Sequence, residues 1–330
     1  MKTGMKAWRI NEKGHPSTAL RLEDIPVPQP GPGEVLVRVE AGTINFADIL
    51  LCQGIYQDRP PVPFTPGLET SGVVEAVGPG VDLRIGSRVA AMSALPAGGY
   101  AEYALLRAHA CLEFPDDIPA THVPLLYSTY QTSHVALFHR GRLKRGERLL
   151  VLGGAGGVGS AAIQLGAAVG AEVIAAAGSA ERLEFCAAQG ATHLIDYNRS
   201  DLAAELLRLT DGQGVDVVYD AVGGAHADAA RRRMAWEGRY LVIGFAGGEI
   251  PNFPANHVLV KNYEVIGVHW SVYNEKGRAA VEAAHADILL LYREGLLRPP
   301  VERTVALADL PQALADLESR AVTGRLVLVP

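Results

Sequence analysis

The sequence predicts an α/β protein in which a doubly wound domain with a parallel sheet interrupts a β-rich domain. Three observations support this prediction. A glycine-rich loop at 153–159 joins an apolar run to an alanine-rich helical stretch. Strand and helix patterns alternate from about 128 to 267, as buried parallel strands joined by crossover helices do. In the first part of the chain, proline and glycine clusters separate short apolar strands.

The composition is typical of a globular protein of about two domains. The 330 residues are 48% hydrophobic and 20% charged, and a domain usually spans roughly 100–200 residues. The formal net charge of -6 disfavours binding to nucleic acid or to an anionic membrane. Three scattered cysteines and an N-terminus without an apolar run favour a reducing compartment and no secretory signal. We therefore expect a cytoplasmic protein without a membrane segment.

Residues 1–127 are interpreted as the first part of the β-rich domain. Valines alternate with other residues over 35–39, as expected of a strand, and a second strand is predicted over 72–77. Proline and glycine clusters at 26–33 and 59–63 predict turns between apolar segments. This pattern is typical of a compact domain with partial-barrel character.

Residues 128–267 are interpreted as the doubly wound domain. Its strands are predicted at 148–152, 172–177, 192–195, 215–219, 239–245 and 264–268. Its helices are predicted at 160–169, 180–188, 202–210 and 225–235. Residues 268–330 return to the β-rich domain, with helices over 276–293 and around 310–319 and a last strand over 325–329.

The loop after the first of these strands predicts a bound dinucleotide. Residues 154–159 read Gly-Ala-Gly-Gly-Val-Gly and fit the pattern G-x-G-x-x-G. In this pattern the glycines make a tight turn, let backbone N–H groups approach a pyrophosphate, and let the helix pack closely on the strand. The positive end of the helix dipole then faces the phosphates. The alternative is a glycine-rich turn required only for packing.

The end of the second strand favours NADPH over NADH. Sites for NAD usually carry an acidic residue there, about 20 residues beyond the glycines, which binds the ribose 2′-hydroxyl. Here the strand ends in alanines and continues with Gly178 and Ser179, and Arg182 follows. No acid there repels a 2′-phosphate, and the Arg182 guanidinium can pair with such a dianion. Alternatively, Arg182 is a solvated helix residue, and Ser179 caps the helix.

These residues resemble a known family. The segment 146–164, glycine loop included, is similar to the signature of the zinc-free quinone oxidoreductase branch of the medium-chain dehydrogenase/reductase superfamily, the NADPH:quinone reductase and zeta-crystallin-like proteins. Ala167 departs from this signature, which usually has a small polar or basic residue there. Further matches are N-F-x-D at 45–48, G-x-Y at 54–56, P-G-x-E-x-x-G at 66–72, and the last helix and strand at 317–320 and 324–328.

The resemblance implies that the protein binds no metal. Zinc-containing relatives place a cysteine where Asn45 stands and a histidine where Leu68 stands. Neither asparagine nor leucine is a usual zinc ligand. Three scattered cysteines also cannot form the four-cysteine structural site of those relatives. Without a Lewis acid, alcohol dehydrogenation is not expected as the main activity.

The resemblance further implies a Rossmann domain inserted in a GroES-like catalytic domain, with the nicotinamide in the cleft between them and Asn45 close to it. The residues that it assigns to NADPH are Tyr130, Thr132, Gly154, Ala155, Gly156, Gly157, Val158, Gly178, Ser179, Arg182, Tyr197, Phe245, Ala246 and Arg320. For Thr132, a second alignment at 127–129 is open. Asn45 is alternatively the cap of a helix over 46–52, and Tyr197 an aromatic residue at a strand end without a phosphate contact.

The implied activity is hydride transfer from NADPH to a quinone or an α,β-unsaturated carbonyl. Such acceptors delocalise the incoming charge onto their own oxygen, so they need proximity and a hydrogen-bond donor rather than a metal. Tyr56 is the candidate donor, with water or a mere packing role for Tyr56 as alternatives. An enoyl-thioester reductase and a nucleotide-binding protein without turnover are the other hypotheses. The resemblance also implies a homodimer formed through the edge of the nucleotide domain.

Overall fold

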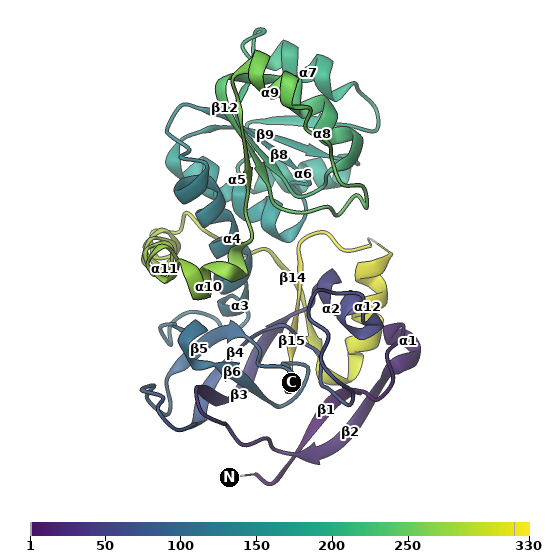
Figure 1. Ribbon diagram of the computed structural model, residues 1–330, viewed down its shortest axis with the longest axis vertical. Helices are drawn as coiled ribbons and strands as arrows, with labels where there is room; N and C mark the ends of the chain where they lie inside the picture. Colours follow the sequence, from purple (N-terminus) through teal and green to yellow (C-terminus); the bar gives the residue numbers. More distant parts are fainter. Residues whose placement is uncertain (1, 320) are drawn as a thin grey trace. The chain divides into compact units, whose positions relative to one another are not determined.

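The computed structural model describes residues 2–319 and 321–330 (Figure 1). The chain divides into two compact units. The first unit comprises Met1–Ser128 and Pro300–Pro330, and the second comprises Thr129–Pro299. A parallel sheet in the second unit and a β-rich first unit confirm the predicted fold class.

The second unit contains a six-stranded parallel sheet. Its strands are β8 (Arg148–Leu152), β9 (Glu172–Ala177), β10 (His193–Asp196), β11 (Val215–Asp220), β12 (Met234–Val242) and β13 (Glu264–Gly267). Their order in space is β10-β9-β8-β11-β12-β13. The chain direction across the sheet reverses between β8 and β11, and doubly wound sheets bind ligands at this switch point.

Both faces of this sheet are covered by helices. These are α5 (Gly157–Val169), α6 (Ala180–Ala188), α7 (Leu202–Leu209), α8 (Gly224–Arg231) and α9 (Ala255–Lys261). Leu150 and Ile174 pack with residues of α7 and α8 in one buried cluster. On the opposite face, Gly166 of α5 lies so close to Leu149 that a Cβ there would be 2.7 Å from its Cδ2. Adjacent strand residues point to opposite faces, and both faces are covered. The strands are therefore apolar throughout.

Several predicted bounds in this unit were wrong, and one helix was missed. The helix predicted over 225–235 ends at Arg231, and β12 begins at Met234 and ends at Val242 rather than at 245. Met234 pairs with Val215 beyond a register shift, and Glu237 has φ 55°, so these residues form a bulged strand and not a helical turn. Helix α9 was missed because none of its residues is buried, so it has no apolar stripe. The helix predicted over 276–293 is divided at Gly277 into α10 (Tyr273–Lys276) and α11 (Arg278–Arg293).

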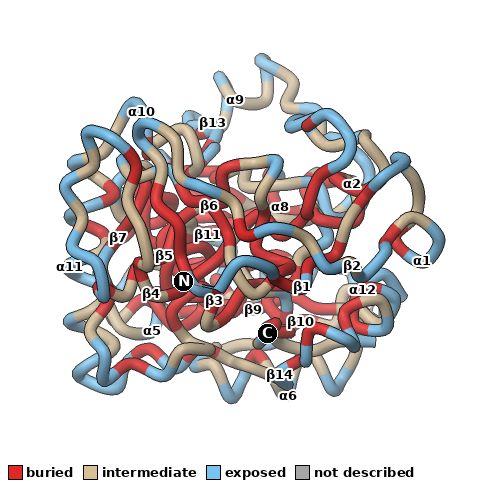
Figure 2. Tube along the Cα trace, turned by 90° about the horizontal axis from the view of Figure 1, so that it is seen from below, coloured by how far each residue is buried: buried red, intermediate tan, exposed pale blue. Residues whose placement is uncertain are grey.

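The first unit contains a two-stranded and a seven-stranded sheet. The strands are β1 (Gly4–Ile10), β2 (Leu20–Pro26), β3 (Glu34–Thr43), β4 (Glu69–Val77), β5 (Arg88–Met92), β6 (Tyr103–Arg107), β7 (Leu112–Glu113), β14 (Val301–Ala306) and β15 (Arg325–Val329). β1 pairs with β2, the larger sheet runs β14-β15-β3-β4-β5-β7, and β6 pairs with β3. Figure 2 shows β3 and β5 largely in the colour of buried residues.

Helices close one end of this core. They are α1 (Pro16–Ala19), α2 (Phe46–Gln53) and α12 (Leu310–Glu318), with α3 (Val123–Leu125) near the end of the first segment. Ile49 and Leu51 of α2 and Leu314 of α12 belong to one buried cluster with Leu328 of β15. The pairing of β15 with β3 therefore brings the end of the chain beside the residues around 43–45.

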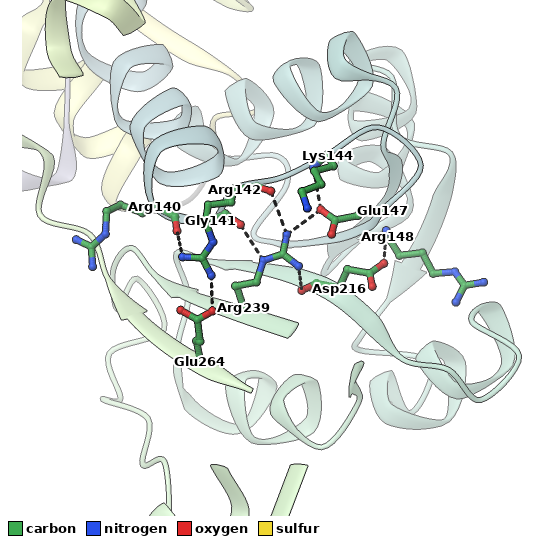
Figure 3. A network of polar contacts seen from close by, with 9 residues as sticks. All are labelled: Arg140, Gly141, Arg142, Lys144, Glu147, Arg148, Asp216, Arg239 and Glu264. Carbon is green, nitrogen blue, oxygen red and sulfur yellow. Dashed lines mark hydrogen bonds and ion pairs between the residues drawn. The ribbon is translucent and has the colours of Figure 1, made fainter. Parts of the chain in front are cut away.

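A buried arginine holds together the edge of the parallel sheet where the strands begin. Arg239 of β12, 8% exposed, donates from Nε to the Gly141 carbonyl at 2.8 Å and from Nη2 to Glu147 Oε2 at 2.7 Å. Asp216 accepts from the backbone N–H of Arg148 at 2.7 Å in the same network (Figure 3). Arg148 is the first residue of β8, so the network lies at the end opposite the glycine loop.

Candidate functional site

The glycine loop lies at the carboxyl end of β8, beside the switch point. Gly153 has φ 73°, a conformation that favours glycine, and its N–H donates to the Ala176 carbonyl of β9 at 3.2 Å. Helix α5 begins at Gly157, three residues earlier than predicted, with Gly156 as its N-cap residue. The first N–H groups of the helix thus belong to the loop itself, the arrangement that suits a phosphate.

Packing constrains Gly154 and Gly159 of the motif strongly and Gly156 only weakly. A Cβ on Gly159 would lie 2.2 Å from the Gly153 carbonyl oxygen, and one on Gly154 would lie 2.9 Å from Cys186 Sγ. A Cβ on Gly156 would meet only the Gly153 oxygen, at 3.3 Å. Internal packing therefore constrains Gly154 and Gly159 more strongly than Gly156, where one backbone oxygen would have to move by a few tenths of an ångström. Close approach of a ligand to the backbone explains Gly156, so the loop fits a dinucleotide pyrophosphate.

Helix α4 (Gln131–His134) is anchored against this loop. Ser133 Oγ donates to the Val158 carbonyl at 2.9 Å and lies 2.9 Å from the Tyr219 hydroxyl. Tyr130 is fully buried, and its hydroxyl donates to Gln164 Oε1 of α5 at 2.8 Å. Burial raises the pKa of Tyr130. The hydroxyl of Tyr130, a residue that the resemblance assigns to NADPH, is thus bonded inside the core, whereas the neighbouring Thr132 is half-buried.

The residues expected around a 2′-phosphate lie at the carboxyl ends of β9 and β10. A Cβ on Gly178 would be 3.0 Å from the Tyr197 ring, so this ring lies against the strand end. The ring of Tyr197 also contacts that of His226, with centroids 4.1 Å apart. Ser179 Oγ accepts from the backbone N–H of Arg182 at 3.4 Å. Ser179 therefore caps α6, the alternative raised from the sequence, and this capping is compatible with a ligand contact.

Two further predicted residues lie in the loop after β12. Phe245 is 43% exposed, and the N–H of Ala246 donates to the Ala221 carbonyl at 3.0 Å. Ala221 follows β11 directly, so the loop lies beside the switch point. Arg320 lies outside the described residues.

In the first unit, Asn45 is the N-cap residue of α2, but its side chain makes other contacts. Its Nδ2 donates to Thr43 Oγ1 at 2.7 Å and to Glu69 Oε2 at 3.0 Å. Its Oδ1 accepts from Nη2 of Arg325. The Asp48 carboxylate accepts from the backbone N–H of Asn45 at 3.1 Å. The Asn45 side chain thus belongs to a polar network at the junction of β3, β4 and β15.

Two more ionisable groups lie in this region. Asp48 is fully buried and accepts from the Leu68 N–H at 2.9 Å. Burial, reinforced by the charge of Glu69, raises the pKa of Asp48 to about 7 despite its hydrogen bonds. Tyr56 is half-buried, and desolvation, followed by the negative charge of Glu69, raises its pKa. At neutral pH the Tyr56 hydroxyl therefore carries its proton.

Sequence reasoning missed Arg325. The strand predicted over 325–329 begins at Arg325, but no role was predicted for its side chain. Its contact with Asn45 joins residues 280 apart in the sequence. Glu69, in the same network, accepts from Thr43 Oγ1 at 2.5 Å. The available signal was a cation at the start of a strand that is otherwise apolar.

The described part of the chain has neither a group of metal ligands nor a membrane-spanning helix. Within residues 2–319 and 321–330, no three His, Cys, Asp or Glu side chains are grouped as metal ligands would be. In the same described part of the chain, every helix is too short or too polar to cross a membrane.

Comparisons with known proteins identify both units. Residues 31–116 match the family of alcohol dehydrogenase GroES-like domains, and residues 157–286 match the zinc-binding dehydrogenase family. Mouse quinone oxidoreductase-like protein 2 is 34% identical, over 98% of this chain and 91% of its own. A mycobacterial protein solved with NADPH has a TM-score of 0.89 and 30% identity, covering 99% of this chain and 100% of the other. Escherichia coli quinone oxidoreductase, also solved with NADPH, has a TM-score of 0.88 and 27% identity, with 98% and 100% covered.

Proposed function

Because the chain belongs to the quinone oxidoreductases of the medium-chain dehydrogenase/reductase superfamily, we propose that it uses NADPH to reduce quinones or α,β-unsaturated carbonyls, without zinc. The observation that supports NADPH binding most directly is Gly156, which internal packing constrains least among the three motif glycines. Two similar proteins were solved with NADPH bound.

The second unit would bind the nucleotide. The pyrophosphate would lie on the backbone of 154–158, at the start of α5, where the helix dipole favours negative charge. The 2′-phosphate would lie near Ser179, Arg182 and Tyr197, beside Gly178. Thr132 of α4 and the exposed loop at 245–246 are the proposed contacts of the nicotinamide half.

The reaction is a two-electron reduction. When bound, NADPH would supply, from its C4–H bond, the hydride that forms a C–H bond at an electron-poor carbon of the acceptor, and the acceptor oxygen would take up the displaced electron pair and a proton. Asn45 is proposed to contact the nicotinamide, and Tyr56, which is protonated at neutral pH, to donate to the acceptor oxygen. An acceptor that delocalises charge in this way needs no Lewis acid.

An acceptor panel tests the activity. NADPH oxidation is measured with 1,4-naphthoquinone, a medium-chain enone and crotonyl-CoA. Turnover of the quinone or the enone supports the proposal, whereas turnover of crotonyl-CoA alone identifies an enoyl-thioester reductase. Binding of NADPH without turnover of any acceptor would identify a nucleotide-binding protein instead. Binding titrations with NADPH and with NADH test the cofactor preference. Equal affinity for both nucleotides would contradict the assignment of the 2′-phosphate site.

We also propose a cytoplasmic homodimer formed through the β13 edge. β13 is an edge strand of the parallel sheet, and Leu259 and Val260 of the preceding helix are 75% and 78% exposed. Exposed apolar residues beside an open strand edge favour pairing with a second copy. Light scattering after gel filtration should give a dimer for the wild type and a monomer for Val260→Glu. A monomeric wild type would refute this proposal.

A further inference from the structure

A half-buried cation in the first unit, Arg325, contacts Asn45. Arg325 is the first residue of β15, and its Nη2 donates to Asn45 Oδ1. Its Nε is buried and, within the described ranges 2–319 and 321–330, has no hydrogen-bond partner. Burial lowers the pKa of Arg325, and the negative charge of Glu69 counteracts this effect. Because a desolvated charge is costly unless it is compensated, a cation at this position calls for an explanation.

The carboxamide of Asn45 connects this cation to an anion. Its nitrogen donates to Glu69 Oε2 at 3.0 Å and to Thr43 Oγ1 at 2.7 Å, while its oxygen accepts from Arg325. The Thr43 hydroxyl donates in turn to Glu69 at 2.5 Å. A flipped amide would direct its NH₂ group at the guanidinium and its oxygen at the carboxylate. Only one orientation is therefore compatible with the two charges.

We propose that Arg325 and Glu69 are positioning residues, which hold the Asn45 amide in one orientation for hydride transfer. This inference rests on the proposed function, in which Asn45 contacts the nicotinamide. The two charges act from opposite ends of one amide, so rotation of Asn45 breaks hydrogen bonds to both. A side chain fixed in this way loses no rotational freedom when the reactants bind. This role explains why a cation with a buried Nε stands at the start of β15.

Four variants test the inference. Arg325→Met removes the cation and keeps an unbranched stem, Glu69→Gln removes the anion at constant shape, and Arg325→Lys keeps a cationic donor. The matched control is Arg303→Met. Arg303 lies opposite Leu326 in the β14–β15 pair and makes a surface ion pair with Asp316. Loss of this second cation should leave both turnover and Asn45 unchanged.

The first measurement needs no cofactor. In protein labelled with ¹⁵N-asparagine, the side-chain amide protons of Asn45 should exchange slowly with water. They should lose this protection in Arg325→Met and Glu69→Gln and keep most of it in Arg325→Lys. The second measurement is turnover with NADPH. Displacement of a reacting group by about 1 Å costs on the order of 10²-fold in rate, so kcat should fall by about that factor in the first two variants, while the Kd for NADPH changes little.

The outcomes separate the two proposals. If the wild type does not oxidise NADPH with any acceptor of the panel, the proposed function fails. The amide exchange still reports on the orientation of Asn45 in that case. Unchanged amide protection in Arg325→Met and Glu69→Gln overturns the inference, and so does lost protection with wild-type kcat. If Arg325→Met does not fold, the kcat values of Glu69→Gln and Arg325→Lys are compared to test the role of the cation. A kcat for Arg325→Lys no higher than that of Glu69→Gln would then contradict the role of the cation.

Discussion

Alanine substitutions in the glycine loop should separate folding from nucleotide binding. A Cβ on Gly159 would lie 2.2 Å from the Gly153 oxygen and 2.9 Å from its carbonyl carbon, both rigid backbone atoms. The loop or α5 would have to shift by about 1 Å, and overpacking of this kind costs about 1–3 kcal/mol. A Cβ on Gly156 has one neighbour, the Gly153 oxygen at 3.3 Å, which would have to move by only a few tenths of an ångström, so the cost to the fold should be much smaller. The same methyl group would stand where the pyrophosphate approaches.

Thermal unfolding with and without NADPH measures both effects. Without nucleotide, Gly159→Ala should melt several degrees below the wild type, since about 1 kcal/mol corresponds to roughly 2–4 °C for a domain of this size. Gly156→Ala should melt close to the wild type. With NADPH at 100 times its Kd, binding stabilises the wild type by about 2.7 kcal/mol. Most of that gain should be absent in Gly156→Ala.

A control substitution lies outside the loop. In Gly4→Ala the new Cβ would meet only the Ile25 carbonyl, at 3.8 Å, so both melting and the NADPH effect should match the wild type. Full stabilisation of Gly156→Ala by NADPH would refute the placement of the pyrophosphate. Wild-type melting of Gly159→Ala would refute the packing argument.

Three further predictions concern groups away from the loop. Arg239→Met should lower the free energy of unfolding in urea by about 3 kcal/mol, because it leaves Glu147 without its cationic partner; an unchanged midpoint would contradict this. The pKa of Asp48 is raised to about 7 in the folded protein, so its contribution to stability is complete below about pH 4 and is lost as the pH rises through 7. The loss amounts to at most about 4 kcal/mol, and urea titrations of Asp48→Asn should lack this pH dependence. Tyr56→Phe should lower kcat by about 10²-fold if Tyr56 is the proton donor, and a variant with full activity would remove Tyr56 from the mechanism.

The sequence alone determined the fold class and the position of the glycine loop. The strands β8, β9 and β15 and the helix α6 have the predicted bounds. These features depend on local properties, namely the periodicity of apolar residues and the conformations that only glycine adopts readily. Where local pattern and tertiary pairing disagreed, as at Met234, the pairing with Val215 prevailed and a strand replaced the predicted helix.

Only the tertiary structure determined how the side chains of the candidate site are engaged. The sequence identified Tyr130 as a nucleotide contact, and the fold buries its hydroxyl against Gln164. No local pattern connects Arg325 with Asn45, because their contact exists only once β15 pairs with β3. Hydrogen bonds between distant segments depend on the register of a sheet, and no local pattern encodes that register completely.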